Sequence, residues 1–533
     1  MLKPLLLLAL LLWGNLLLAQ PSFPYRIQLD PVSVPGLNGL HSYAFAQHQG
    51  DWLFIGGRLD GIHARQPFNA FPASMNNTFM RVLNPSTGQS WSMSVDSLPV
   101  ALREQFQSTN LNYYQHGDSL VLVGGYGYSS TAADHITHPR LTVVSVSGLI
   151  GAIKNNRSPN PHVLTLNDAR FAVTGGQLGK LGENYVLVGG HRFDGRYNPM
   201  NGPSFTQTYT NEIRRFAIQQ NNGQLNVLKY QAQNDLQHLH RRDFNLVPQR
   251  FADGSMGYML STGVFQQAAD LPFLYNIDID AAGYHPRMAF QQLLSHYHSA
   301  HFSFFDSTSS HNHTIFFGGM AQYFYQNDSM VQDNRVPFIN TISRVTRDQN
   351  DSLFEAKLPI TMPALLGASA EFIPNEALNF TTSELLLLGS SSADTLLVGH
   401  IYGGLSSVSP NPFSFNQTST TAAASSLYAV RLIRNQALAL TPLQQNLPNY
   451  DFKVYPNPVK RKFTVEFTLE KIVPVRFQIT DTTGKVILKG SFEAHETGLN
   501  EAEVELPDGT RGTLLISLVF DKSQVVTKRI QTR

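Results

Sequence analysis

Residues 112–125 read NYYQHGDSLVLVGG, which combines a short aromatic strand, a Gly-Asp turn, a second strand of aliphatic residues and a pair of glycines. Five further copies of this pattern end at the pairs 56–57, 189–190, 262–263, 318–319 and 403–404, the fourth pair of the six being Thr-Gly. The first positions of successive pairs are separated by 68, 65, 73, 56 and 85 residues. A repeat of this size built from short strands predicts a propeller or another repeating β structure.

Each repeat can be divided into four strands, which we label a to d in chain order. In the first repeat, the alternation of apolar and polar residues predicts strands at 42–47, 52–55, 79–83 and 91–95. The sixth repeat has a third strand at 427–433 but no clear fourth one, which leaves an open sheet edge. The isolated strand at 25–30 is predicted to complete that sheet.

Residues 25–434 resemble the kelch propellers. The resemblance rests on the doubled glycine that ends the second strand, on the hairpin turn NPSTG at 84–88 and on Trp91 shortly after it. It implies an all-β, kelch-type β-propeller of about six blades. Seven blades are the alternative count, because the repeats exceed the usual kelch length and Trp91 alone keeps the tryptophan. A tandem of β-sandwiches is the alternative architecture.

The two ends of the chain predict an exported protein. Residues 1–19 have the layout of a signal peptide, with Lys3 ahead of a leucine-rich run, and an uncleaved anchor is the alternative. No later stretch could cross a bilayer, so we expect no transmembrane segment after cleavage. Residues 435–450 are predicted to be a linker. Residues 451–533 alternate strongly, which favours a small immunoglobulin-like β-sandwich.

This last segment resembles the C-terminal sorting domain of the type IX (Por) secretion system of Bacteroidetes, of the type A kind. The matching residues are the motif Tyr455, Pro456, Asn457 and Pro458, the stretch ITDTTGKVI at 479–487 and the ending VTKRI at 526–530. The resemblance implies that the type IX machinery is a partner. It also implies a secreted protein, or one on the outer-membrane cell surface, that passes through the periplasm. An immunoglobulin-like carbohydrate module is the alternative.

Composition excludes several kinds of chemistry. Charged residues make up 14% of the chain and the net charge is +1, which argues against a nucleic-acid partner. The absence of cysteine excludes zinc-thiolate, iron–sulfur and thiol chemistry, and we expect no cofactor. In a strand, His296 and His298 would lie on one face and His301 on the other, so a joint metal site would need a bend. We expect no metal site. His311 and His313 are predicted to lie in a solvated turn.

The long connections between strands b and c of each repeat are predicted to gather on one face together with the d-to-a connections. Insertions on one face of a repeat protein commonly mark its binding face. We expect the ligand-binding residues there to be His41, Asn112, Arg170, Arg242, Asp243, His298, His301, Tyr126, Arg192 and Tyr323. These aromatic and cationic groups suit a glycan or protein ligand.

The alternative function is a surface carbohydrate-active enzyme, a hydrolase or sugar epimerase, that uses the propeller channel. The sequence identifies no catalytic residues for it. An enzyme of this kind needs an acid and a base within hydrogen-bond reach at the channel mouth, whereas a binding protein does not.

Overall fold

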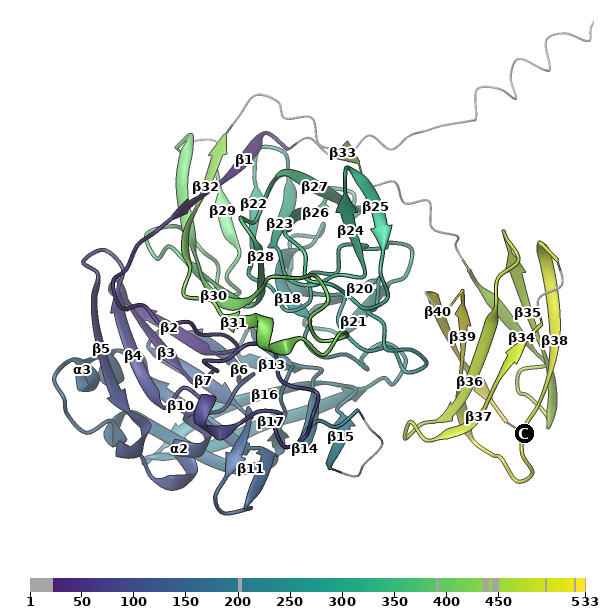
Figure 1. Ribbon diagram of the computed structural model, residues 1–533, viewed down its shortest axis with the longest axis horizontal. Coiled ribbons are helices and arrows are strands. Elements are labelled where there is room, and N and C mark those ends of the chain that lie inside the picture. Colours follow the sequence, from purple (N-terminus) through teal and green to yellow (C-terminus); the bar gives the residue numbers. More distant parts are fainter. Residues whose placement is uncertain are drawn as a thin grey trace, which may run out of the picture.

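The structure is a computed structural model that describes residues 23–199, 204–389, 393–434, 441–442, 450–493, 496–521 and 524–532. The predicted signal peptide and most of the predicted linker lie outside these residues. Figure 1 shows a larger body, coloured purple to green, and a smaller yellow one. Both are built of β-strands, and the described α-helices are α2 (Val100–Phe106) and α3 (Val146–Lys154). No helix in the described part of the chain is long and apolar enough to cross a membrane.

The larger body contains six sheets that follow one another along the chain, each built on four antiparallel strands, with further short strands added to the fifth and sixth. Sheets one to three consist of β2 (Ala44–His48), β3 (Asp51–Ile55), β4 (Phe79–Asn84) and β5 (Gln89–Ser94); β6 (Asn112–His116), β7 (Ser119–Val123), β10 (Pro139–Ser145) and β11 (Val163–Ala172); and β12 (Gln177–Leu181), β13 (Asn184–Val188), β16 (Glu212–Asn221) and β17 (Gln224–Asn234). Sheets four to six consist of β18 (Asn245–Arg250), β19 (Met256–Ser261), β20 (Asn276–Ile279) and β21 (Tyr284–Arg287); β22 (His301–Asp306), β23 (His311–Phe317), β26 (Thr341–Arg347) and β27 (Leu353–Thr361); and β28 (Leu365–Pro374), β30 (Thr395–Ser407), β32 (Leu427–Arg434) and β1 (Tyr25–Pro31).

The sixth sheet joins the two ends of the larger body. Its outer strand β1 runs antiparallel to β32, with Tyr25 opposite Arg434 and Pro31 opposite Tyr428. The predicted pairing of the N-terminal strand is therefore confirmed.

The glycine pairs form the joints between neighbouring sheets. All twelve positions, including Thr262 and Gly263, have positive φ, which glycine adopts without strain. In the five Gly-Gly pairs, the second N–H donates a 2.8–3.1 Å hydrogen bond to a carbonyl at the start of the next sheet. A Cβ on the first glycine would lie 1.8–2.7 Å from a carbonyl oxygen there, so only glycine permits this approach.

In the fourth pair, the Thr262 hydroxyl donates to the Ser295 carbonyl over 2.7 Å in place of the glycine bond. The sixth joint runs from the Gly404 N–H to the Leu40 carbonyl and returns to the first sheet. The six joints therefore form a closed circuit.

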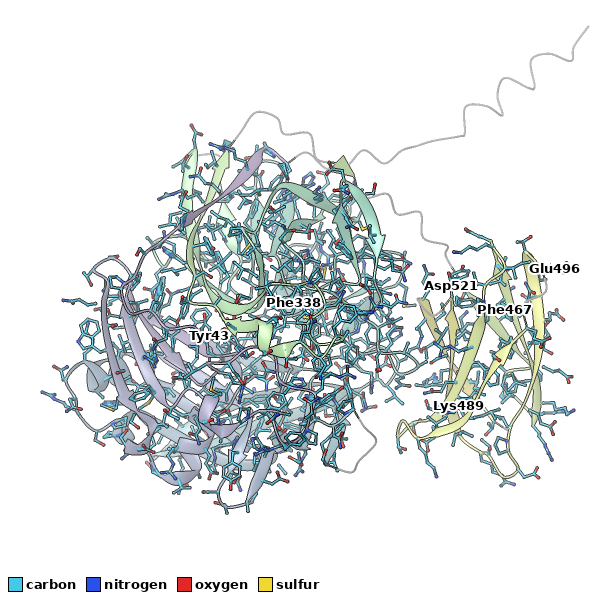
Figure 2. All side chains as sticks on the ribbon, viewed as in Figure 1. Tyr43, Phe338, Phe467, Lys489, Glu496 and Asp521 are labelled. Atoms are coloured by element: carbon cyan, nitrogen blue, oxygen red, sulfur yellow. The ribbon has the colours of Figure 1, made fainter. Side chains whose placement is uncertain are left out.

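The apolar core of the larger body is divided into layers between consecutive sheets. One cluster joins sheets one and two through residues such as Ala44, Leu53, Leu120 and Val144. Equivalent clusters lie between each later pair, and the cluster of Leu40, Tyr43, Trp52, Phe54, Leu83, Ile373, Tyr402 and Leu427 joins sheets six and one. Side chains fill these layers, with Tyr43 near the middle of the body (Figure 2).

The prediction that His311 and His313 lie in a solvated turn is wrong, because both belong to a strand and His313 lies in this interior. Both lie in β23, and His313 is fully buried against Phe23 and Phe304. Its Nδ1 lies 2.8 Å from the Thr346 hydroxyl. The two histidines thus form the beginning of the strand that continues through the apolar residues Ile315 to Phe317.

Several b-to-c connections carry hairpins of their own. These are β8 (Tyr126–Ser129) with β9 (Asp134–Thr137), β14 (His191–Gly195) with β15 (Phe205–Tyr209), and β24 (Tyr323–Gln326) with β25 (Ser329–Gln332). In the sixth sheet, β31 (Thr421–Ala423) pairs with β30. We call the face that carries these connections the loop face and the face that carries the a-to-b turns the hairpin face.

The a-to-b connection of the sixth sheet is long. It contains β29 (Leu386–Leu388), which pairs in parallel with β22 of the fifth sheet. Segment 375–389 therefore crosses from one sheet to the next on the hairpin face. Within the predicted linker, β33 (Thr441–Pro442) pairs with β27.

The smaller body consists of two sheets that share one apolar core. They contain β34 (Phe452–Tyr455), β35 (Lys462–Leu469) and β38 (Gly498–Glu505), and β37 (Val486–Phe492), β36 (Val475–Asp481), β39 (Thr513–Phe520) and β40 (Gln524–Gln531). Phe467 and Phe520 lie in that core, and Phe467 is labelled in Figure 2.

Candidate functional site

Six residues, one at the start of each sheet, form a narrow ring where the sheets meet. Each has a positive φ between 33° and 66°, and they are Ser42, Asn110, Gly175, Asp243, His298 and Ser369. Five of the six steps around this ring are backbone N–H to carbonyl hydrogen bonds of 2.5–3.1 Å. At the remaining step, the Thr174 hydroxyl donates to the Asn110 carbonyl over 3.1 Å. We call this ring the neck.

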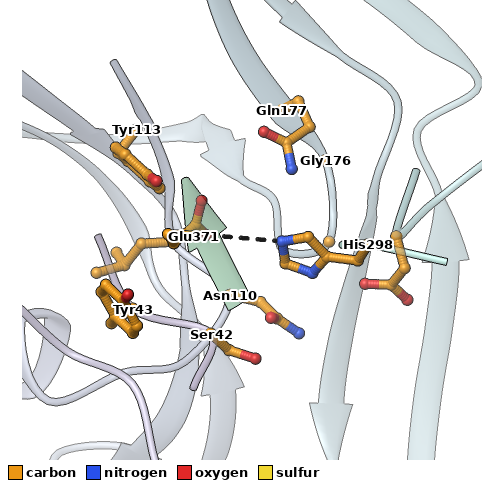
Figure 3. Close-up of a pocket in the computed structure, with 11 residues that line it drawn as sticks. Ser42, Tyr43, Asn110, Tyr113, Gly176, Gln177, His298 and Glu371 are labelled. Carbon is orange, nitrogen blue, oxygen red and sulfur yellow. Dashed lines mark ion pairs between the residues drawn. The ribbon is translucent and has the colours of Figure 1, made fainter. Parts of the chain in front are cut away.

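A small pocket occupies the neck and is lined by residues from all six sheets (Figure 3). Its volume is about 10 Å³, which is room for one water molecule. His298 and Glu371 face each other in it, with Nε2 and Oε1 3.8 Å apart. This separation exceeds a hydrogen bond, so the two side chains interact as charges.

The neck pocket is a coupled group of titratable side chains. Burial alone would lower the pKa of His298, but the Glu371 carboxylate and, less strongly, the Asp243 charge raise it above its ordinary value. Burial and the same carboxylate raise the pKa of Tyr113 well above 10. His298 can therefore hold a proton between two carboxylates.

On the loop side of the neck, Arg242 and Asp243 form a buried ion pair. Arg242 Nη1 donates to Asp243 Oδ2 over 2.5 Å, and its Nε donates to the Tyr209 hydroxyl over 3.0 Å. The Tyr297 hydroxyl donates to the same carboxylate over 2.9 Å. Despite burial, the Arg242 charge keeps the pKa of Asp243 below its ordinary value. The charges of Arg242 and Asp243 are therefore compensated within the protein.

A second ion pair lies beside the first. Arg58 donates two hydrogen bonds to Asp60, of 2.8 and 2.6 Å, and one of 2.8 Å to Asn76. His41 Nε2 lies 3.9 Å from the same Asp60. Arg58, Asp60 and Asn76 all belong to the first b-to-c connection. Because Arg58 and His41, the neighbour of the neck residue Ser42, exchange backbone hydrogen bonds of 3.2 and 3.0 Å, the pair lies where that connection joins the neck.

Above these pairs, connections from sheets one, three and six meet in an aromatic cluster of His63, Phe71, Tyr197 and Phe413. His63 stacks on Phe71 at 4.4 Å between ring centres and meets Tyr197 and Phe413 at 5.0 and 5.2 Å. Burial lowers the pKa of His63 to about 4, so its ring is neutral at pH 7. The cluster therefore lies over the loop side of the neck as an apolar layer.

Four of the residues predicted to bind ligand meet at the neck: His41, Arg242, Asp243 and His298. His301 lies on the hairpin side, three residues beyond the neck, and lines the cavity there. Asn112 is buried and ties sheets two and three, because its Nδ2 donates to Val123 at 3.1 Å and to Val173 at 2.9 Å.

The other four predicted residues do not join this group. Arg170 lies on the outermost strand β11, paired with Asp168 and set over the Tyr230 ring at 4.4 Å. Arg192 is exposed and bonded to Asp194 over 2.6 Å. Tyr126 and Tyr323 begin the hairpins β8 and β24, and both are buried. The Tyr126 hydroxyl donates to the Gly195 carbonyl over 2.6 Å.

Sequence reasoning did not single out Glu371, Tyr113, Asp60 or Arg58, although they shape the neck. One signal could have located the neck itself. Ser42, Asn110 and Gly175 each precede the first glycine of their pair by 14 residues. A common phase relative to the repeat marks residues that occupy equivalent positions.

Among the described residues, no group of three or more His, Asp or Glu side chains is gathered closely enough to hold a metal ion. His296 instead contacts the Gly318 carbonyl at 2.7 Å and the Ser343 hydroxyl at 2.6 Å, which explains it as a buried structural residue.

The motif at 455–458 is bonded to other strands of the smaller body. The Tyr455 hydroxyl donates to Glu501 over 2.7 Å, and the Asn457 side chain accepts from the Gln531 N–H over 3.1 Å. Val459 continues this contact, since its N–H donates to the Gln531 carbonyl over 2.6 Å. The beginning and the end of the body are thus held together.

Comparison with known families agrees with this end of the chain. Residues 453–532 match the family model described as "Secretion system C-terminal sorting domain". The chain is therefore that of a protein exported by type IX secretion, whose machinery it must contact, and it is located on the cell surface or secreted.

The larger body has no such assignment. No curated protein matches the chain. Among solved structures, it is similar to one titled "Structure of YjhT", with 12% sequence identity, a TM-score of 0.42, and coverage of 78% of this chain and 98% of that one.

Proposed function

We propose that residues 25–434 form a kelch-type β-propeller of six blades that binds a glycan or protein partner through its loop face. In this proposal, the signal peptide at 1–19 starts export, 435–450 link the propeller to the sorting domain, and 451–533 form an immunoglobulin-like sandwich. Support for the propeller comes from the closed circuit of joints, the layered core and the shared edge of β1 and β32.

The observation that carries the binding role is the contrast between packed and exposed apolar residues on the loop face. The aromatic cluster is held by Arg65, whose guanidinium donates to the Ser414 carbonyl over 3.2 Å and lies 5.7 Å from the Phe413 ring centre. On the same connections, Phe68, Val408 and Phe415 are exposed by 73%, 82% and 55%. Exposed apolar groups on rigidly held loops are the kind of anchor that partners use.

Binding can be tested with the double variant Phe68→Ala with Phe415→Ala. Neither side chain supports the core, so the fold should be retained, while binding to a glycan array or to a captured surface protein should fall at least about tenfold. Leu228→Ala, at an apolar residue 41% exposed on the outermost strand β17, serves as the control. Unchanged binding by the double variant, or equal loss in the control, would reject the loop face.

A second candidate function, a carbohydrate-active enzyme, rests on the His298–Glu371 pair. The two groups have the chemistry of a base and an acid, and such pairs often tighten when substrate binds. Hydrolysis of nitrophenyl glycosides and epimerisation of free sugars followed by NMR would test it. Turnover that disappears in Glu371→Gln would favour the enzyme over the binding protein.

Export can be tested separately. Deletion of residues 451–533 should leave the protein in the periplasm of its native host, because the sorting domain directs it through the outer membrane. Normal delivery of the truncated protein to the surface or the medium would contradict this assignment.

A further inference from the structure

A second, larger cavity lies on the hairpin side of the neck. Its volume is about 110 Å³, and it shares Tyr113, Gln177 and Glu371 with the neck pocket. Its walls follow from the period of two in the innermost strands. Residues three positions beyond the neck face inward, and they are Phe45, Tyr113, Leu178, Leu246, His301 and Phe372.

Segment 375–389 closes the far end of this cavity. The Tyr114 hydroxyl donates to the Thr382 carbonyl, and Asn375 Nδ2 donates to the Leu397 carbonyl over 2.9 Å. Strand β29 then holds the segment against β22. These contacts place Phe380 and Glu384 among the residues that line the cavity.

Glu384 brings a carboxylate without a cation into this space. Its side chain is exposed to the hollow, although protein surrounds the site, and it has no hydrogen bond within the described structure. Burial and then the charge of Glu371 raise the pKa of Glu384 to about 7. No lysine or arginine occurs among the described residues that line the cavity.

The histidines nearby do not balance both carboxylates. Burial lowers the pKa of His301, so that ring is neutral at pH 7. His298 lies on the neck side and faces Glu371. Two carboxylates that influence each other across a mostly protein-lined space repel, and a cation between them would relieve that repulsion.

Aromatic rings form much of the remaining wall, beside uncharged polar side chains. Tyr113 meets Phe45 edge to face at 5.5 Å, Phe372 stacks on Phe302 at 5.1 Å, and Tyr114, Tyr258 and Phe380 also line the cavity. The uncharged polar residues of the lining are Gln47, Gln115, Gln177, Ser303 and Ser383. Aromatic faces attract organic cations, most strongly where water is excluded. A cavity of about 150 Å³ holds benzene, so about 110 Å³ suits a head group of four or five heavy atoms.

We propose that this cavity, lined by Glu371, Glu384 and the surrounding aromatic rings, is a binding site for a small organic ammonium group. The site is separate from the loop face and does not depend on the binding role proposed there.

The test uses the full chain and two probes of the same tetrahedral shape, tetramethylammonium chloride and neutral tert-butanol, in calorimetric titrations at constant ionic strength. Tetramethylammonium should bind with a Kd in roughly the millimolar range, and tert-butanol at least about tenfold more weakly. Equal binding of the two probes would reduce the site to an apolar hollow and overturn the proposal.

Variants then locate the site. Glu384→Gln should weaken tetramethylammonium binding at least about tenfold, whereas Glu376→Gln, on the same segment but outside the cavity, should leave it unchanged. Phe380→Leu keeps an apolar side chain and removes one ring, so it should weaken binding about threefold or more. If either variant fails to fold, the other still tests the site. Full affinity in every variant that folds would overturn the proposal.

Two further measurements distinguish this cavity from a divalent-cation site and from the loop face. If calcium chloride displaces tetramethylammonium at micromolar concentration, the carboxylates form a divalent-cation site and the proposal is wrong. The loop-face variant Phe68→Ala with Phe415→Ala should bind tetramethylammonium like the unaltered protein. Failure on the loop face and failure in the cavity can thus be told apart.

Discussion

The two sides of the neck differ in whether their carboxylates are paired with cations. On the loop side, the two carboxylates described beside the neck each have a cation from the protein: Asp60 is bonded to Arg58, and Asp243 to Arg242. On the hairpin side, Glu384 has no such partner among the described residues and lies near Glu371. Paired charges hold connections in place, whereas an uncompensated carboxylate lowers stability and is available to a ligand. We infer that the charged side chains on the loop side of the neck stabilise the fold, whereas the carboxylate on the hairpin side is available to bind a cation.

The largest expected effect breaks the loop side of this comparison. Asp243→Asn keeps a residue that tolerates positive φ but leaves the Arg242 guanidinium without its counter-ion. The free energy of unfolding, measured by urea titration, should fall by about 2–4 kcal/mol. Asp168→Asn removes the partner of the half-exposed Arg170 and should change it by less than about 1 kcal/mol. Similar losses in the two variants would show that the buried pair has no special weight.

A smaller effect is expected at the neighbouring pair. Asp60→Asn weakens the bonds of Arg58 and removes the charge beside His41, so stability should fall by about 1–3 kcal/mol. Limited proteolysis should also show faster cleavage within 61–72, because the ion pair that holds the start of this connection to Arg58 is weakened. Asp96→Asn, at an exposed pair with Arg103, is the control. Protection of 61–72 equal to that of the unaltered protein would argue against the fixing role.

On the hairpin side, replacing the carboxylate of Glu384 should raise the stability of the protein at high pH instead of lowering it. The pKa of Glu384 in the folded protein is about 7, above its ordinary value of 4.5, so the folded state binds the proton more tightly. Its contribution to stability is therefore complete below pH 4.5 and is lost as the pH rises through 7. Glu384→Gln should match the unaltered protein at pH 4.5 and melt roughly 1–2 °C higher at pH 8. A lower Tm at pH 8 would show instead that a cation of the protein stabilises the Glu384 carboxylate.

The smallest effect concerns a residue far from the neck. Arg170→Ala should change the free energy of unfolding and ligand affinity by less than about 0.5 kcal/mol, because its ion pair lies on the outermost strand. A tenfold loss of ligand affinity would restore Arg170 to the binding surface expected from the sequence.

The sequence predicted the repeating sheets because each joint has a local requirement. A glycine pair, such as Gly124 and Gly125, allows one sheet to approach the backbone of the next, so the signal recurs in five of the six copies. The pairing of β1 with β32 followed from a missing fourth strand. Both are properties of short segments or of a simple strand count.

The site was harder to predict because the sixth repeat departs from the common phase. Ser369 precedes Gly403 by 34 residues, against 14 in the first three repeats, since segment 375–389 is inserted between them. This insertion obscured the equivalence of Glu371 with Gln177 and gave no indication of where Glu384 lies. Tyr126 and Tyr323 were expected to be free on long loops, but those loops fold into hairpins that bury them.

The pairing of β1 with β32 also determines when the larger body can close during synthesis of the chain. Ile27 leaves the ribosome first among the described strands, yet its partner Leu432 follows about four hundred residues later. Until then, the sixth sheet lacks its outer strand, and the layer of Phe23 and Tyr25 against Phe304 cannot form. Contacts this distant in sequence form slowly. Closure of the larger body therefore waits until almost its last strand has been made, and the growing chain stays open at this seam for nearly all of its synthesis.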